Sequence, residues 1–164
     1  MLRTWMLGWL LVPALCLGLL GCSSSEEGPD GEWLRAEVTV GSENFLLLIC
    51  RNALNDQGFP VGAGLDADAL TIVSGWRTQL APFRGQGMRH RAHLRCTELE
   101  GDRWSVEVRV QMQVNMDIVR PTDLTYAEWE WRPDDQTQAR VLLAQVRSLL
   151  GEPLELRSGG VKTN

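Results

Sequence analysis

Four stretches of the chain alternate apolar and polar side chains with the two-residue period of a β-strand. They cover residues 32–40, 70–80, 88–97 and 103–116. The turn formers at 100–102 separate the last two stretches and predict a hairpin. In the stretch 70–80, the alternation puts Trp76 on the same face as Ile72, and Arg77 on the other. A further edge strand is expected over 124–131.

Two other stretches carry apolar side chains at the three- and four-residue spacing of a helix. The first covers about 43–56, with Ser42 as the expected N-cap and Gly58 just past the end. The second follows Asp135, which has Gln138 three residues later in a variant of the capping box, and it ends near Gly151. The residues between 62 and 68 are expected to form a loop.

The order of these elements predicts an α+β fold: a two-layer sandwich in which two helices cover one face of an antiparallel sheet of about four or five strands. Cys50 lies on the apolar face of the first helix, and Cys96 lies on the apolar face of the strand 88–97. The two cysteines are therefore expected to meet where the helical layer packs on the sheet.

The composition fits one folded domain, with 164 residues of which 44% are hydrophobic and 23% are charged. The formal net charge of −5 argues against a nucleic-acid binder.

The N-terminus carries Arg3 and then a run without charged residues from Trp5 to Leu20. This run is shorter than the roughly 20 residues that a membrane-spanning helix needs, and it is close to the apolar core of a signal peptide. It ends in Leu19-Leu20-Gly21-Cys22, which resembles the lipobox of bacterial lipoproteins. The alternative is an ordinary signal peptide that ends near a cysteine.

The resemblance implies that residues 1–21 are a signal peptide and that Cys22 is the lipidation site, carrying acyl chains such as palmitate. Two or more acyl chains would hold the protein on a membrane. Ser23 resembles the residue that sends lipoproteins to the outer membrane, where they face the periplasm, in a host with two membranes. Residues 22–31 are polar and predict a flexible tether, followed by a single domain over 32–157 and a disordered tail over 158–164.

Once Cys16 is removed with the signal peptide and Cys22 is lipidated, Cys50 and Cys96 are left. A secreted domain reaches an oxidising compartment, so these two are predicted to form a disulfide. By closing the loop of chain between Cys50 and Cys96, the disulfide would stabilise the fold by about 4 kcal/mol. The alternative is a pair of buried free thiols.

Motifs for nucleophilic catalysis, phosphate binding and zinc proteases are missing from the sequence. His90 and His93 are three residues apart on a strand and point to opposite faces, so they cannot bind one metal ion together. Glu128 and Glu130 flank Trp129 and could be an acid pair beside a sugar-binding ring, but the same pattern is typical of an alternating strand. We expect no cofactor, no metal and no enzymatic activity.

Basic residues are concentrated between residues 77 and 95, where five arginines and no acidic residues occur. On the polar face of the strand 88–97 they would form a row, which suits an anionic partner. The candidate residues are Arg77, Arg89, Arg91, His93, Arg95 and Arg109. The alternative is a solvated face that nearby acidic residues neutralise. The five tryptophans after residue 31 are expected mostly in the core, whereas an exposed pair would mark a binding surface.

The size, the anchor and the order of elements resemble small accessory lipoproteins of envelope-assembly machines, such as those of lipopolysaccharide transport and barrel assembly. This resemblance rests on the lipobox and the coarse element order. It implies a non-catalytic accessory or scaffold subunit of a membrane-associated complex, with a protein partner in the envelope. The alternative is a binding module for an anionic glycan or lipid that uses the arginine-rich sheet face.

Overall fold

A computed structural model describes residues 28–60, 62, 64–66, 68–80 and 86–152 of the chain. Seven strands within this part form one antiparallel sheet: β1 (Leu34–Thr39), β2 (Gly64–Asp66), β3 (Thr71–Val73), β4 (Arg77–Gln79), β5 (Met88–Glu98), β6 (Arg103–Asn115) and β7 (Trp129–Arg132). The helices are α1 (Glu43–Asp56), α2 (Gln136–Leu149) and the short 3-10 helix η1 (Leu124–Tyr126).

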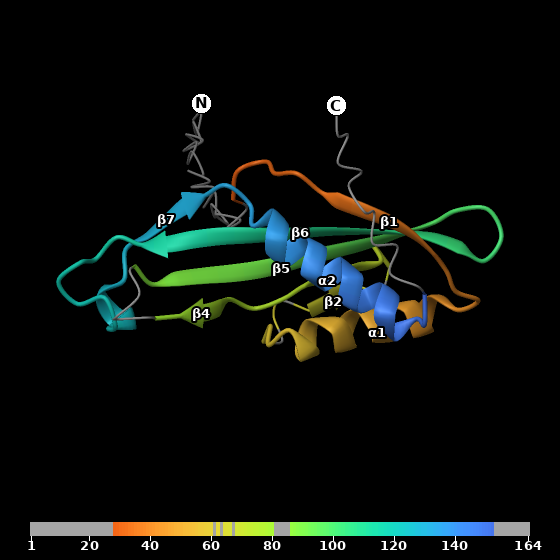
Figure 1. Cartoon of the computed structure of the whole chain (residues 1–164), viewed down its shortest axis with the longest axis horizontal. Helices are drawn as coiled ribbons and strands as arrows, with labels where there is room; N and C mark the ends of the chain where they lie inside the picture. Colours follow the sequence, from red (N-terminus) through yellow and green to blue (C-terminus); the bar gives the residue numbers. More distant parts are fainter. Residues whose placement is uncertain (1–27, 61, 63, 67, 81–85, 153–164) are drawn as a thin grey trace, which may run out of the picture.

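The long hairpin of β5 and β6 forms the centre of the sheet and runs the length of the molecule (Figure 1). Its tight turn includes Gly101, whose φ of 68° lies in the left-handed region that favours glycine. β1 and β7 both pair with β6 along one side of the hairpin, while β3 and β4 pair with β5 along the other. β2 extends the sheet beyond β3.

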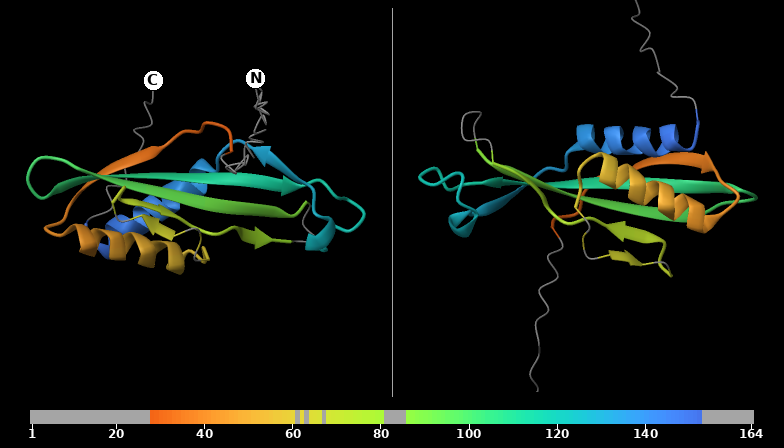
Figure 2. Two further views of the ribbon diagram at one scale, coloured as in Figure 1. Left: turned by 180° about the vertical axis from the view of Figure 1, so that it is seen from behind. Right: turned by 90° about the horizontal axis from the view of Figure 1, so that it is seen from below.

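Both helices cover the same face of this sheet and share its core (Figures 1 and 2). α2 lies across β6 and β1, and α1 lies beside α2. The even-numbered residues of β5 and β6 point to this side, where Ala92, Val106, Val108 and Val110 are fully buried. None of the helices in the described residues has the length and hydrophobicity that a membrane span requires.

The structure confirms the predicted α+β sandwich, with more strands than expected. Part of the predicted loop over 62–68 pairs as β2, and the predicted strand over 70–80 is divided into β3 and β4. The predicted edge strand over 124–131 begins as η1 and pairs only from Trp129 onward. The predicted signal peptide, the predicted lipidation site Cys22, residues 23–27 of the predicted tether, residues 153–157 and the predicted tail lie outside the described residues.

One extra residue between β3 and β4 reverses the direction of the side chains that follow it. Ile72 of β3 pairs with Leu94 of β5, and Arg77 of β4 pairs with His90 of β5. Between these two pairs, the segment from β3 to β4 advances five residues while β5 advances four. This two-against-one arrangement is a β-bulge. It turns Trp76 away from the helices and Arg77 toward them, which is the reverse of the faces that strict alternation predicts.

Candidate functional site

The sheet face turned away from the helices carries the odd-numbered residues of β5 and β6, and we call it the open face. Its central rows pair Arg89 with Gln113, Arg91 with Gln111, His93 with Arg109, and Arg95 with Glu107. The residues that lie around these rows are Trp33, Trp76, Trp129 and Trp131.

Arginine and tryptophan side chains stack on one another over this face. The guanidinium of Arg89 lies between two rings, 4.4 Å from the centre of Trp76 and 4.5 Å from the centre of Trp129. Arg91 lies 4.6 Å from the same Trp76 ring. Because all three distances fall within about 6 Å, each contact is a cation–π interaction.

The stacking continues in both directions from this centre. Trp131 packs on Trp76 with ring centres 5.8 Å apart and planes tilted by 52°. Toward the other end, Arg95 lies 4.2 Å from the ring of Trp33 and also pairs with Glu107. We call the whole arrangement the Trp–Arg layer, and its members are Trp33, Trp76, Trp129, Trp131, Arg89, Arg91 and Arg95.

Two buried glutamines lie under the layer and bind two of its three arginines. Gln113 is 5% exposed, and its Oε1 accepts a 2.6 Å hydrogen bond from Nε of Arg89. Gln111 is 2% exposed, and its Oε1 accepts from Nε of Arg91 at 3.2 Å and from Nε2 of His93 at 2.8 Å. The layer is therefore held in place before any partner arrives, since each of these arginines is fixed by a ring and by an amide.

Arg109 lies in the predicted row but is neutralised inside the molecule. Its Nε lies 2.5 Å from a carboxylate oxygen of Asp134, and the two side chains are only 11% and 7% exposed. Its Nη2 also donates to the carbonyl oxygen of Pro29. Residues 28–31, which were expected to belong to a flexible tether, thus lie against the open face. Gly28 there is so close to Trp131 that an added Cβ would lie 2.6 Å from the ring.

Arg77 is not part of the row, because the β-bulge places it on the helical side. It donates to the carbonyl oxygen of Gln57 at 2.6 Å and to Oε1 of Gln138 at 2.8 Å, and it stacks on Phe59. Burial lowers the pKa of this guanidinium, and the charge of Asp135 opposes the shift. Five of the six candidate residues that the sequence predicts do lie together on the open face: Arg89, Arg91, His93, Arg95 and Arg109.

The two histidines point to opposite faces, as their spacing predicts. Nε2 of His90 lies 3.2 Å from a carboxylate oxygen of Asp135 at the start of α2, although the direction of this contact is not that of a good hydrogen bond. Burial lowers the pKa of both His90 and His93; the Asp135 charge opposes this for His90, and the Gln111 hydrogen bond opposes it for His93. Among the described residues, no group of three His, Cys, Asp or Glu side chains could hold a metal ion.

The tryptophans differ from the expectation of a core role. Trp104 is in the core, 5% exposed, and its Nε1 donates to the carbonyl oxygen of Val40 at 2.9 Å. The other four tryptophans of the described chain lie on the open face. The alternation of Glu and Trp over 128–131 did signal a strand with two unlike faces, but it did not reveal which face the helices cover.

Cys50 and Cys96 meet between the helical layer and the sheet, as their positions predict. Cys50 and Cys96 are both buried, and their side chains share a hydrogen bond. That hydrogen bond and the burial raise the pKa of the Cys50 thiol. The disulfide between them stays a prediction.

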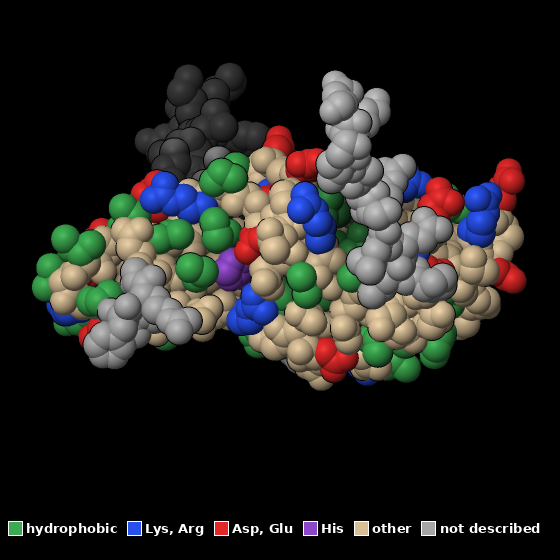
Figure 3. All heavy atoms as spheres, in the orientation of Figure 1, with side chains coloured by type: hydrophobic (Ala, Val, Ile, Leu, Met, Phe, Trp, Pro, Cys, Tyr) green, Lys and Arg blue, Asp and Glu red, His purple; other side chains and the backbone are tan. Residues whose placement is uncertain are grey.

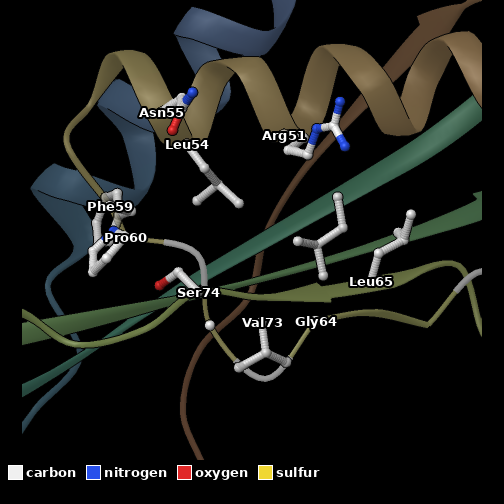
Figure 4. A pocket seen from close by; sticks show the side chains of 11 residues that line it. Arg51, Leu54, Asn55, Phe59, Pro60, Gly64, Leu65, Val73 and Ser74 are labelled. Atoms are coloured by element: carbon white, nitrogen blue, oxygen red, sulfur yellow. The ribbon is translucent and has the colours of Figure 1, made fainter.

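A separate hollow lies between α1 and the hairpin of β2 and β3 (Figure 4). Its volume is about 210 Å³, and its walls are mostly apolar, with Leu54, Phe59, Leu65 and Val73 among them. This volume is below the roughly 300–1,000 Å³ of common ligand sites. The open face is therefore the stronger candidate for function.

Comparison with models of known protein families and with curated proteins finds no match for this chain. The functional argument therefore rests on the geometry of the open face.

Proposed function

We propose that this protein is a membrane-anchored lipoprotein of the cell envelope that acts as a non-catalytic accessory or scaffold subunit. In this proposal the lipid on Cys22 holds the domain at the membrane. The open face docks a protein partner within a membrane-associated complex.

The observation that carries the proposal is the Trp–Arg layer. Tryptophan and arginine are among the residues that most often dominate the binding energy of protein interfaces. Here their side chains are already fixed by stacking and by Gln111 and Gln113, so a partner would lose little side-chain freedom on docking.

The charge distribution supports a protein partner over a simple anion. Of the predicted row, Arg95 is paired with Glu107, Arg109 is paired with Asp134, and Arg77 lies on the other side of the sheet. An anionic glycan or lipid would meet a face with acidic groups built into it. A protein surface with both charges and apolar groups fits this face better.

The test is a crosslinked pull-down of the full-length, lipidated protein from native membranes, with mass spectrometry of the products. We expect one dominant membrane partner in near-equal amount. Arg89→Glu with Arg91→Glu should lower the affinity for this partner at least about thirtyfold, as expected when two central contacts each lose about 1 kcal/mol or more. The matched control is Arg51→Glu with Arg140→Glu, which makes the same charge change on exposed residues of the two helices.

A further double variant distinguishes a protein partner from an anionic ligand. Arg89→Lys with Arg91→Lys keeps the positive charge but removes the planar group that stacks on Trp76 and Trp129. A protein partner should be lost with this pair, whereas an anionic ligand should be largely retained. If lipid or glycan is recovered in place of a protein, the accessory-subunit proposal is wrong and the face is a binding site for an anionic ligand.

A further inference from the structure

The loop that joins β6 to β7 presents large apolar side chains to solvent at one end of the molecule. Ile118 and Val119 are 80% and 82% exposed, and Leu124 and Tyr126 are 58% and 48% exposed. In the space-filling view, hydrophobic side chains gather at this end (Figure 3). We call residues 116–126 the apolar loop. Apolar groups this exposed and this close together are typical of a surface that contacts another body.

Two aspartates of the apolar loop accept hydrogen bonds from the loop's own backbone. Oδ1 of Asp117 accepts from the backbone N–H of Val119 at 2.8 Å and of Arg120 at 2.9 Å, and the Asp117 side chain is only 11% exposed. Asp123 accepts from the N–H of Thr125 in the same way. Satisfied backbone groups lower the cost of entering a medium without water.

The loop is also fixed to the end of the sheet. The side chain of Asn115, which is 1% exposed, accepts from the backbone N–H of Asp117 at 3.0 Å and of Glu128 at 3.1 Å. The guanidinium of Arg120 lies 3.3 Å from the centre of the Tyr126 ring. The apolar side chains are therefore held outward by a preformed loop, and binding does not have to order them.

The described chain begins beside β7, with Gly31 next to Arg109 and Gly28 nearer the loop, next to Trp131. Gly28 packs on Trp131 of β7, and β7 directly follows the loop in the chain. Five residues separate Gly28 from Cys22, so the two can be at most about 20 Å apart. A lipid on Cys22 would thus keep β7 and the neighbouring apolar loop near the membrane surface.

We propose that the apolar loop inserts into the surface layer of the bilayer that holds the lipid of Cys22. Ile118 and Val119 enter the boundary between headgroups and acyl chains, where Tyr126 and Arg120 suit the polar interface. The inference rests on the lipid anchor of the proposed function, and it adds a second contact that fixes how the domain is oriented on the membrane.

The test uses the full-length, lipidated protein in vesicles of phosphatidylethanolamine and phosphatidylglycerol. An environment-sensitive NBD probe is attached at Ile118→Cys or Val119→Cys, two positions too exposed to affect folding. The matched control is Glu100→Cys, an exposed residue in the turn at the far end of the β5–β6 hairpin. The unsubstituted protein measures labelling of the buried Cys50 and Cys96.

We expect nitroxide-labelled lipids to quench the probes at 118 and 119 at least about threefold more strongly than the probe at 100, since inserted groups lie about 5–10 Å deep. Incorporation of a clickable palmitate into the same protein reports the anchor independently. If palmitate is present and the probes at 118, 119 and 100 are quenched equally, the insertion of the apolar loop is wrong, whereas the proposed function is not contradicted. If Cys22 carries no palmitate, both the insertion of the apolar loop and the proposed function are wrong.

A third comparison addresses a protein as the occupant of the loop. If the probe at 118 stays water-exposed in lipid vesicles but becomes shielded in native membranes, the apolar loop binds a protein and the insertion is wrong.

Discussion

Arginine has two different roles on the two faces of this sheet, and both depend on the planar guanidinium. Arg77 bridges the end of α1 and the start of α2 through Gln57 and Gln138. Arg89 lies between two indole rings while its Nε binds Gln113. A lysine could satisfy neither arrangement, because it has a single compact donor group without a flat face.

At the scale of single residues, the contact between Cys50 and Cys96 leads to a prediction about oxidation. In protein isolated from cells without reductant, we expect neither Cys50 nor Cys96 to react with maleimide after unfolding. Reduction should expose both thiols and lower the free energy of unfolding by about 4 kcal/mol, as chain-entropy arguments give for this loop.

The control for this prediction is Cys50→Ala with Cys96→Ala, whose stability should not change on adding oxidant or reductant. Two reactive thiols in the untreated, unfolded protein would contradict the disulfide and support buried free cysteines.

At the scale of elements, the two helices begin in different ways. The Asp135 side chain accepts from the backbone N–H groups of Thr137 and Gln138, both at 3.0 Å, as the sequence predicts for this N-cap. The amide of Gln138 binds Arg77 and so does not complete a capping box. Ser42 occupies the N-cap position of α1, but its side chain makes no capping hydrogen bond.

We therefore expect unequal effects from removing the two caps. Asp135→Ala should lower the free energy of unfolding by about 1 kcal/mol, because two N–H groups lose their acceptor. Ser42→Ala should change it by less than about 0.5 kcal/mol. Urea unfolding of both variants measures the difference, and equal losses would show that the Ser42 hydroxyl does cap α1 in solution.

At the scale of the whole molecule, stability should depend on pH through the two histidines. Both imidazoles have a pKa below the ordinary 6.5 in the folded protein, mainly because they are buried. Below pH 6.5 the unfolded chain therefore binds more protons than the folded protein. The free energy of unfolding should be fully retained above this pH and should fall as the pH drops below it.

Chemical unfolding at several pH values between about 5 and 8 checks this dependence. In His93→Gln, the new glutamine can still donate to Gln111, and the free energy of unfolding should depend less on pH than in the wild type. Adding His90→Gln should reduce this pH dependence further. A wild-type stability that does not change, or that rises as the pH falls toward 5, would contradict burial of the two imidazoles as the cause.

The helices and the long hairpin could be read from the sequence because their patterns are local. Residues 43–56 form α1 with the predicted bounds, and the alternation over 103–116 corresponds to β6. The same patterns predicted that Cys50 and Cys96 would meet. They failed at residues 70–80, because a bulge is an extra residue relative to a neighbouring strand and leaves no mark in the alternation itself.

The two helices, the long hairpin, the class of fold and the layer boundary where the cysteines lie could all be predicted from the sequence, since these follow from which side chains must leave water. Tertiary structure decided which partner each polar side chain takes. It placed Arg77 beside α2, neutralised Arg109 with Asp134, and moved four tryptophans onto the open face. These outcomes depend on strand register and on contacts between residues far apart in the chain, which a local pattern does not specify.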